Sequence, residues 1–94
     1  MSGEITDDGK ENGEERNLGV QPLDALMTER GVDNHALVAA SSEPMTHKAV
    51  QRARRGRKLT KHMQRRMVAA FNKVLQQQGM EESFALRQLF NYEA

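Results

Sequence analysis

The stretch Lys61–Gln78 carries the clearest helical pattern in the chain, and it limits the possible folds more than any other feature. Its apolar residues recur every three or four positions, which places them on one face of an α-helix. They are Met63, Met67, Ala70, Phe71, Val74 and Leu75. Thr60 suits the N-terminal cap of this helix and Gly79 suits its end. We therefore expect a small helical core in which this helix is the longest element.

Shorter helices are predicted on both sides of this stretch, because each has a residue that suits a helix start or end. Gly31 suits the end of the first of these helices, and either Asp33 or Asn34 can cap the start of the second. Thr46 suits the start of the third helix and Gly56 suits its end. The predicted ranges are 22–30, 35–41, 47–55 and 82–91. The predicted fold class is all-α, a small four- to five-helix bundle.

The N-terminal part of the chain differs in composition from the rest. Residues 1–20 hold six acidic residues against Lys10 and Arg16, which is a net charge of −4, and they are poor in apolar side chains. Such a segment buries too little apolar surface to offset its ordering entropy. We expect 1–20 to be a disordered acidic tail, 21–78 the helical domain, and 79–94 a C-terminal helix.

The segment Thr46–Gln78 is strongly basic. It holds ten Lys or Arg residues and no Asp or Glu, although the whole chain has a formal net charge of only +1. A block this basic repels itself unless an anion neutralises it, so its charge favours a phosphate backbone as the partner. A solvated helix face that keeps the protein soluble is the alternative. The cations fall on one side of two predicted helices, which favours nucleic acid.

Three consecutive stretches follow the order of elements in a known family. They are LDALMTERGVDNHALVAASS, MTHKAVQRARRG and KLTKHMQRRMVAAFNKVL, and they lie within residues 22–78. Residues 22–74 resemble the lambda-repressor/Cro-like helix-turn-helix family on these grounds. The resemblance implies a helix-turn-helix whose second helix, 47–55, lies in the DNA major groove. The turn SSEPM departs from the family because it lacks the usual glycine and is slightly longer.

The resemblance also implies which side chains meet DNA. In the family the N-terminal residues of the second helix contact base edges, and the matching positions are Thr46, His47, Lys48, Gln51 and Arg52. A Gln amide suits adenine, and Lys or Arg suits guanine, at roughly 1–3 kcal/mol of discrimination for each good pair. That Gln51 is an ordinary polar surface residue is the alternative.

A second group of cations surrounds the end of this helix and the loop that follows. Such side chains suit phosphate contacts, which position a protein on DNA without specifying sequence. They are Arg54, Arg55, Arg57, Lys58 and Lys61. The sequence therefore predicts base contacts at the start of the helix and phosphate contacts at its end.

The last predicted helix is a candidate contact between two copies of the chain. One module of this size contacts few base pairs, so useful specificity calls for a homodimer on paired half-sites. The residues that we expect at this contact are Leu86, Leu89, Phe90 and Tyr92. Their alternative role is to cover the core of their own chain as a lid.

Composition and motifs set several other classes aside. The chain has no Cys, so it has neither a disulfide framework nor a thiolate zinc site, and His35, His47 and His62 lack metal-site spacing. No catalytic constellation and no phosphate-cradling glycine loop is present, so we expect no enzyme, no cofactor and no small-molecule ligand. No apolar run reaches membrane-spanning length, which predicts a cytoplasmic, nucleoid-associated protein without membrane contact.

The leading hypothesis from the sequence is a bacterial, repressor-like regulator of transcription that binds double-stranded DNA. RNA stays open as a partner because it also offers phosphates. The competing hypothesis is a helical interaction module, antitoxin-like, that binds RNA, a ribosomal surface or an acidic protein. Dependence of binding on base sequence separates the two hypotheses.

Overall fold

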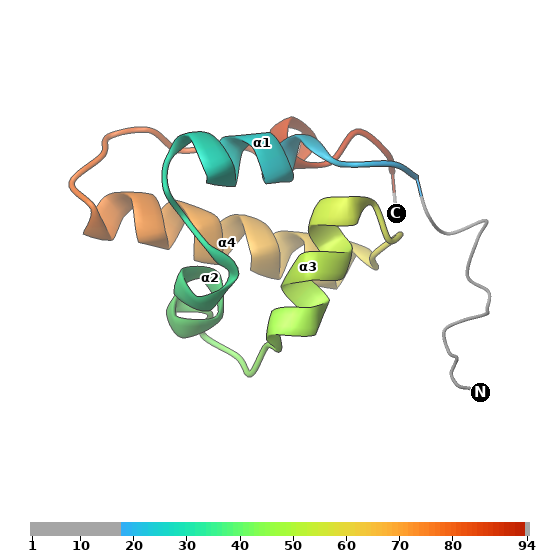
Figure 1. Cartoon of the computed structure of the whole chain (residues 1–94), viewed down its shortest axis with the longest axis horizontal. Helices are drawn as coiled ribbons and strands as arrows, with labels where there is room; N and C mark the ends of the chain where they lie inside the picture. The colour runs from blue at the N-terminus through green and yellow to red at the C-terminus, as the bar shows by residue number, and fades with distance from the viewer. Residues whose placement is uncertain (1–17, 94) are drawn as a thin grey trace.

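Five α-helices make up the regular secondary structure of residues 18–93, the part of the chain that this computed structural model describes (Figure 1). They are α1 (Pro22–Glu29), α2 (Asn34–Ala40), α3 (His47–Arg55), α4 (Lys61–Gln77) and α5 (Leu86–Leu89). The predicted all-α fold class is confirmed. Most of the predicted disordered tail, residues 1–17, lies outside the described residues.

The first four helices begin and end within one residue of their predicted bounds, because the capping groups act locally. The hydroxyls of Thr46 and Thr60 each accept a hydrogen bond from the backbone N–H three residues further on, at 2.9 and 3.2 Å. Asp33, rather than Asn34, caps α2 in the same way at 2.8 Å. Gly56 ends α3 with a φ of 108°, a left-handed conformation that favours glycine.

The apolar faces of all five helices pack together in one core. α4 packs against α2 and α5, whereas α3 packs against α1 and α2. Burying a large apolar side chain contributes about 1.5–3 kcal/mol, and this packing stabilises helices that would be marginal alone. The buried apolar residues are Leu23, Met27, Val32, Leu37, Ala40, Val50, Ala53, Met67, Ala70, Phe71, Val74, Leu75, Leu89 and Phe90.

The last helix is much shorter than predicted, so the predicted range 82–91 is wrong. Asn72 of α4 supplies the reason, because its side chain accepts a hydrogen bond from the Phe84 N–H at 2.9 Å and donates to the Phe84 carbonyl at 3.0 Å. The bond to the carbonyl occupies the acceptor that a helix from 82 would offer to the Gln88 N–H, which donates to the Ala85 carbonyl at 2.9 Å instead. Leu89 and Phe90, just beyond, are buried in the core of their own chain, which is the arrangement that the lid alternative describes.

The chain before α1 runs along the C-terminal end of α3. Leu18 and Gln21 donate their backbone N–H groups to α3-end carbonyls at 2.8 and 2.9 Å. Gln21 is only 1% exposed, and its amide donates to the Gly19 carbonyl at 2.9 Å and accepts from the Asn91 N–H at 2.8 Å. Residues 18–20, which the sequence places in the tail, therefore belong with the folded domain.

Candidate nucleic-acid interface

α3 has one face in the core and one face in solvent. Val50 and Ala53 are fully buried against the other helices. Lys48, Arg52 and Arg55 lie on the opposite face at spacings of four and three residues, and all three are exposed. Within residues 18–93, no ion pair or hydrogen bond engages their charged groups. These cations are therefore available to an external anion.

Three further cations follow α3, two in the loop and one at the start of α4. The side chains of Arg57, Lys58 and Lys61 are also without an ion pair or hydrogen bond in the described part of the chain. Tyr92 fixes the loop backbone, because its hydroxyl accepts from the Leu59 N–H at 2.9 Å and donates to the Arg57 carbonyl at 3.2 Å. The backbone on both sides of Lys58 is thus fixed by the C-terminal segment. Nothing local in the sequence indicates this role of Tyr92.

Arg54 differs from its basic neighbours, since the domain itself uses its guanidinium. Nε donates to Asp24 Oδ1 at 2.6 Å, Nη1 donates to Asn34 Oδ1 at 2.7 Å, and Nη2 donates to Thr28 Oγ1 at 3.3 Å. The side chain is only 16% exposed. Arg54 therefore joins α1, α2 and α3, and its surroundings favour this structural role over the phosphate contact that the sequence predicts.

Gln51 lies at the edge of the same network and is half-buried. Its Oε1 accepts a hydrogen bond from Asn34 Nδ2 at 3.0 Å, and Asn34 is held in turn by Arg54. The Gln51 amide still has its two N–H donors and one lone pair of Oε1, which is the set that adenine requires. Contact of Gln51 with a base stays a prediction, and the network fixes where its amide lies.

The N-terminal ends of α2 and α3 meet beside this face. The exposed rings of His35 and His47 lie with their centroids 5.6 Å apart, tilted by 35°. Thr46 is exposed, and its hydroxyl is engaged in capping α3. Sequence spacing does not indicate the contact of the two imidazoles, because the folding of α2 onto α3 creates it.

The described residues contain no group of three or more His, Cys, Asp or Glu side chains placed to share a metal ion. None of the helices in 18–93 is both long enough and apolar enough to cross a membrane. Comparisons of the chain with models of protein families, with curated proteins and with solved structures found no match.

Proposed function

We propose that this protein is a sequence-specific DNA-binding regulator of transcription that places α3 in the major groove. The proposal rests on the row of exposed cations Lys48, Arg52 and Arg55, which have no partner within residues 18–93. Like charges three or four residues apart on a helix repel one another, and an anion alongside removes that repulsion. The domain does pair the arginines that it needs for its own structure, so the absence of described partners for these three cations favours an external ligand.

The dimensions of α3 agree with this proposal. α3 has nine residues, and an α-helix with its side chains is about 10–12 Å across. The major groove is about 12 Å wide and admits an α-helix. In this arrangement His47, Lys48, Gln51 and Arg52 face the bases, whereas Thr46 caps the helix.

The cations at the other end of α3 take the phosphate backbone. They are Arg55, Arg57, Lys58 and Lys61, and Arg54 is assigned to the domain's own network instead. In this proposal the protein acts in the bacterial nucleoid as a repressor-like regulator, and a second copy on a neighbouring half-site supplies the remaining specificity.

Fluorescence-anisotropy titrations test the proposal with random duplex DNA, single-stranded RNA and a pool of genomic fragments, each at two salt concentrations. We expect duplex DNA to bind with log K falling by about 3.6 per tenfold rise in salt, which corresponds to four neutralised phosphates at about 0.9 each. We also expect one class of fragments to be enriched from the pool. No duplex binding at low salt, or a clear preference for RNA, refutes the proposal and favours the interaction-module hypothesis.

A matched pair of variants tests the assignment of the surface. Lys58→Met should lower the salt slope by about 0.9, because one phosphate contact is lost. Lys73→Met is the control, since Lys73 is also exposed but lines hollows that contain none of the proposed phosphate contacts. Gln51→Ala should change the base preference in a selection from random duplexes. An unchanged preference contradicts base contact by Gln51.

A further inference from the structure

The turn between α2 and α3 is stabilised by its own side chains rather than by a glycine. The Ser41 hydroxyl donates to the Glu43 carbonyl at 2.6 Å and accepts from the Glu43 N–H at 3.4 Å. Pro44 is exposed and has no N–H to donate, so its carbonyl is the polar backbone group that it offers to a partner. Met45 is half-buried against the core. The turn is thus anchored at Met45, and its exposed part has a second anchor on another helix.

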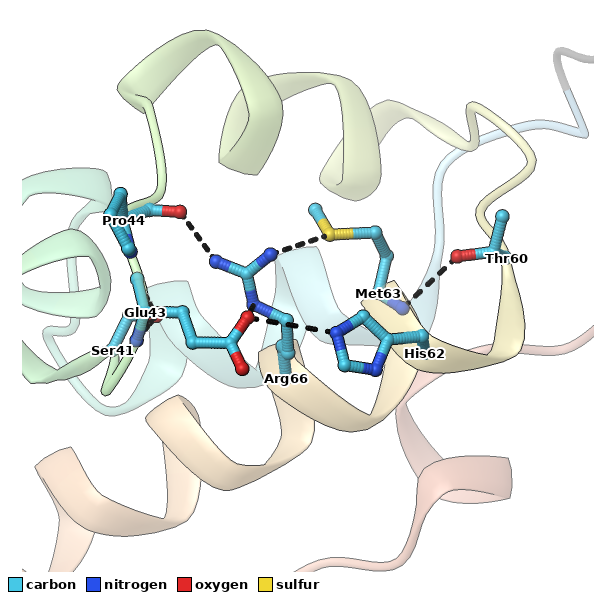
Figure 2. Close-up of polar contacts among 7 residues, drawn as sticks. All are labelled: Ser41, Glu43, Pro44, Thr60, His62, Met63 and Arg66. Carbon is cyan, nitrogen blue, oxygen red and sulfur yellow. Dashed lines mark hydrogen bonds and ion pairs between the residues drawn. The ribbon is translucent and has the colours of Figure 1, made fainter.

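Arg66 of α4 supplies that anchor (Figure 2). Its Nη2 donates to the Pro44 carbonyl, and its Nη1 donates to the Met63 sulfur at 3.3 Å. Its Nε lies 3.3 Å from Glu43 Oε1, which is an ion-pair contact without hydrogen-bond geometry. His62 Nε2 lies 3.6 Å from the same oxygen. One guanidinium therefore contacts both the backbone and the carboxylate of the turn.

These contacts fix the start of α3 relative to α2. α4 packs against α2, so a turn that is bound to α4 is bound to the same rigid unit. Thr46, the cap of α3, follows Pro44 by two residues. The Arg66 side chain is 18% exposed and the Glu43 side chain is 53% exposed, so water and salt screen their ion pair in part. Loss of the contacts would release the Pro44 end of the turn and let the first turn of α3 shift.

The two ends of α3 are held by different groups. The start depends on Arg66, whereas the end is held by Gly56, which packs against Gly19, and by the Tyr92 contacts to the following loop. Base contacts tolerate only small displacements, because a bidentate pair needs fixed donor and acceptor positions. Phosphate contacts from long flexible cations tolerate larger ones. A shift at the start of α3 should therefore affect sequence discrimination more than overall affinity.

We propose that Arg66 is a positioning residue for sequence discrimination, and that it sets the angle at which α3 meets the bases without contacting nucleic acid itself. This inference rests on the proposed function. A merely structural arginine would, when replaced, weaken binding to all DNA sequences together. A positioning arginine would, when replaced, change the ratio between affinities for preferred and random DNA.

The test replaces Arg66 by Lys, which keeps the charge but lacks the planar guanidinium that contacts the carbonyl, the carboxylate and the Met63 sulfur from three different nitrogens. Arg65→Lys is the matched control, since Arg65 is the exposed neighbour without a partner in the described residues. Anisotropy titrations give the affinity for the enriched fragment, the affinity for random duplex and the salt slope, at a temperature where circular dichroism shows all variants folded. Glu43→Gln is a second variant that removes only the carboxylate, which is 53% exposed.

We expect Arg66→Lys to lower the ratio of preferred to random affinity by about tenfold, the equivalent of one good base contact. The affinity for random duplex and the salt slope should stay within about twofold of the wild type, because no phosphate contact is removed. Glu43→Gln should lower the ratio by about two- to threefold in the same direction, since a half-exposed ion pair contributes less. Arg65→Lys should leave the ratio unchanged.

An unchanged ratio in Arg66→Lys, or equal losses on both DNAs, overturns the inference while the proposed function stands. If Arg66→Lys does not fold, the Glu43→Gln ratio decides in the same way. Absence of duplex binding by the unaltered protein is a different failure, because it refutes the proposed function and the role in discrimination with it. Amide hydrogen exchange over residues 41–48 then shows whether Arg66 holds the turn at all.

Discussion

Replacing Arg54 by Met removes the guanidinium that joins α1, α2 and α3 and keeps most of the apolar part of the side chain. Three hydrogen bonds are lost, to Asp24, Asn34 and Thr28 at 2.6, 2.7 and 3.3 Å. Hydrogen bonds to charged groups contribute roughly 1.5–3 kcal/mol each. Asp24 is 39% exposed and Thr28 is exposed, so water replaces part of what is lost. We expect the free energy of unfolding to fall by about 2 kcal/mol.

Thermal and urea unfolding, followed by circular dichroism, measure this loss. About 2 kcal/mol lowers Tm by roughly 8–16 °C in a domain of this size. Arg55→Met is the control, because Arg55 is exposed and has no described partner, and its effect should stay within about 0.5 kcal/mol.

The two variants should behave oppositely in DNA titrations. Arg55→Met should lower the salt slope by about 0.9, whereas Arg54→Met should leave it unchanged wherever the variant is folded. If Arg54→Met is as stable as the wild type and has the lower slope, the reasoning from the structure is refuted. The phosphate contact that the sequence predicts for Arg54 would then be correct.

Four further substitutions test individual contacts of the fold. Gly56→Ala should lower the free energy of unfolding in urea by about 3 kcal/mol, because φ is 108° and the new Cβ would lie 1.9 Å from a backbone oxygen. Gly31→Ala, with a φ of 67° and no atom within 4 Å, should lose only about 1 kcal/mol, and equal losses would contradict the role of close packing. Asn72→Ala leaves both backbone groups of Phe84 without their partner, so we expect a loss of about 2 kcal/mol and faster hydrogen exchange at that amide; unchanged exchange would argue against the explanation for the short α5. The guanidinium of Arg30 donates two hydrogen bonds to the Glu82 carboxylate, each at 2.8 Å. These bonds hold the pKa of the Glu82 carboxyl below its usual range. A lowered pKa stabilises the fold above the ordinary carboxyl pKa, and that stabilisation disappears as pH falls through the lowered value. Glu82→Gln should therefore have a slightly lower Tm than the wild type at neutral pH and the same Tm in acid, and a difference independent of pH would count against the ion pair.

The helix bounds were predictable because local chemistry determines them. Thr46 caps α3 through a hydrogen bond to a residue only three positions further along the chain, and Gly56 ends α3 through its own backbone conformation. The apolar spacing of α4 identifies its buried face in the same local way. That face also includes Gln64, which is buried at helical spacing from Met67, Phe71 and the other apolar residues although its amide is polar. Polarity alone would have placed Gln64 in solvent.

The last helix was predicted too long because a distant residue competes for its backbone. The spacing of Leu86, Leu89 and Phe90 favours a helix, and nothing within 82–91 opposes it. Asn72 lies 12 residues from Phe84 in the sequence and forms hydrogen bonds with its backbone groups. Side-chain to backbone competition of this kind depends on tertiary packing, so a local pattern does not reveal it.

The functional roles of the arginines could not be predicted from the charge run either. Arg54 and Arg55 are adjacent in sequence, and so are Arg65 and Arg66, but a helix turns about 100° between neighbours. One member of each pair contacts partners inside the domain, and the other is exposed and has no partner among the described residues. The contacts of Arg54 span 20 to 30 residues of sequence.

This division has a measurable consequence for the basic segment as a whole. Thr46–Gln78 holds ten cations, and if all of them neutralised phosphates, log K would fall by about 9 per tenfold rise in salt. Arg54 and Arg66 contact other residues of the domain, and in the proposed interface four of the remaining eight cations contact phosphates. A slope of log K against log salt of about −3.6 therefore agrees with this division. A slope of about −9 would mean that all ten cations neutralise phosphates, whichever helix face they lie on.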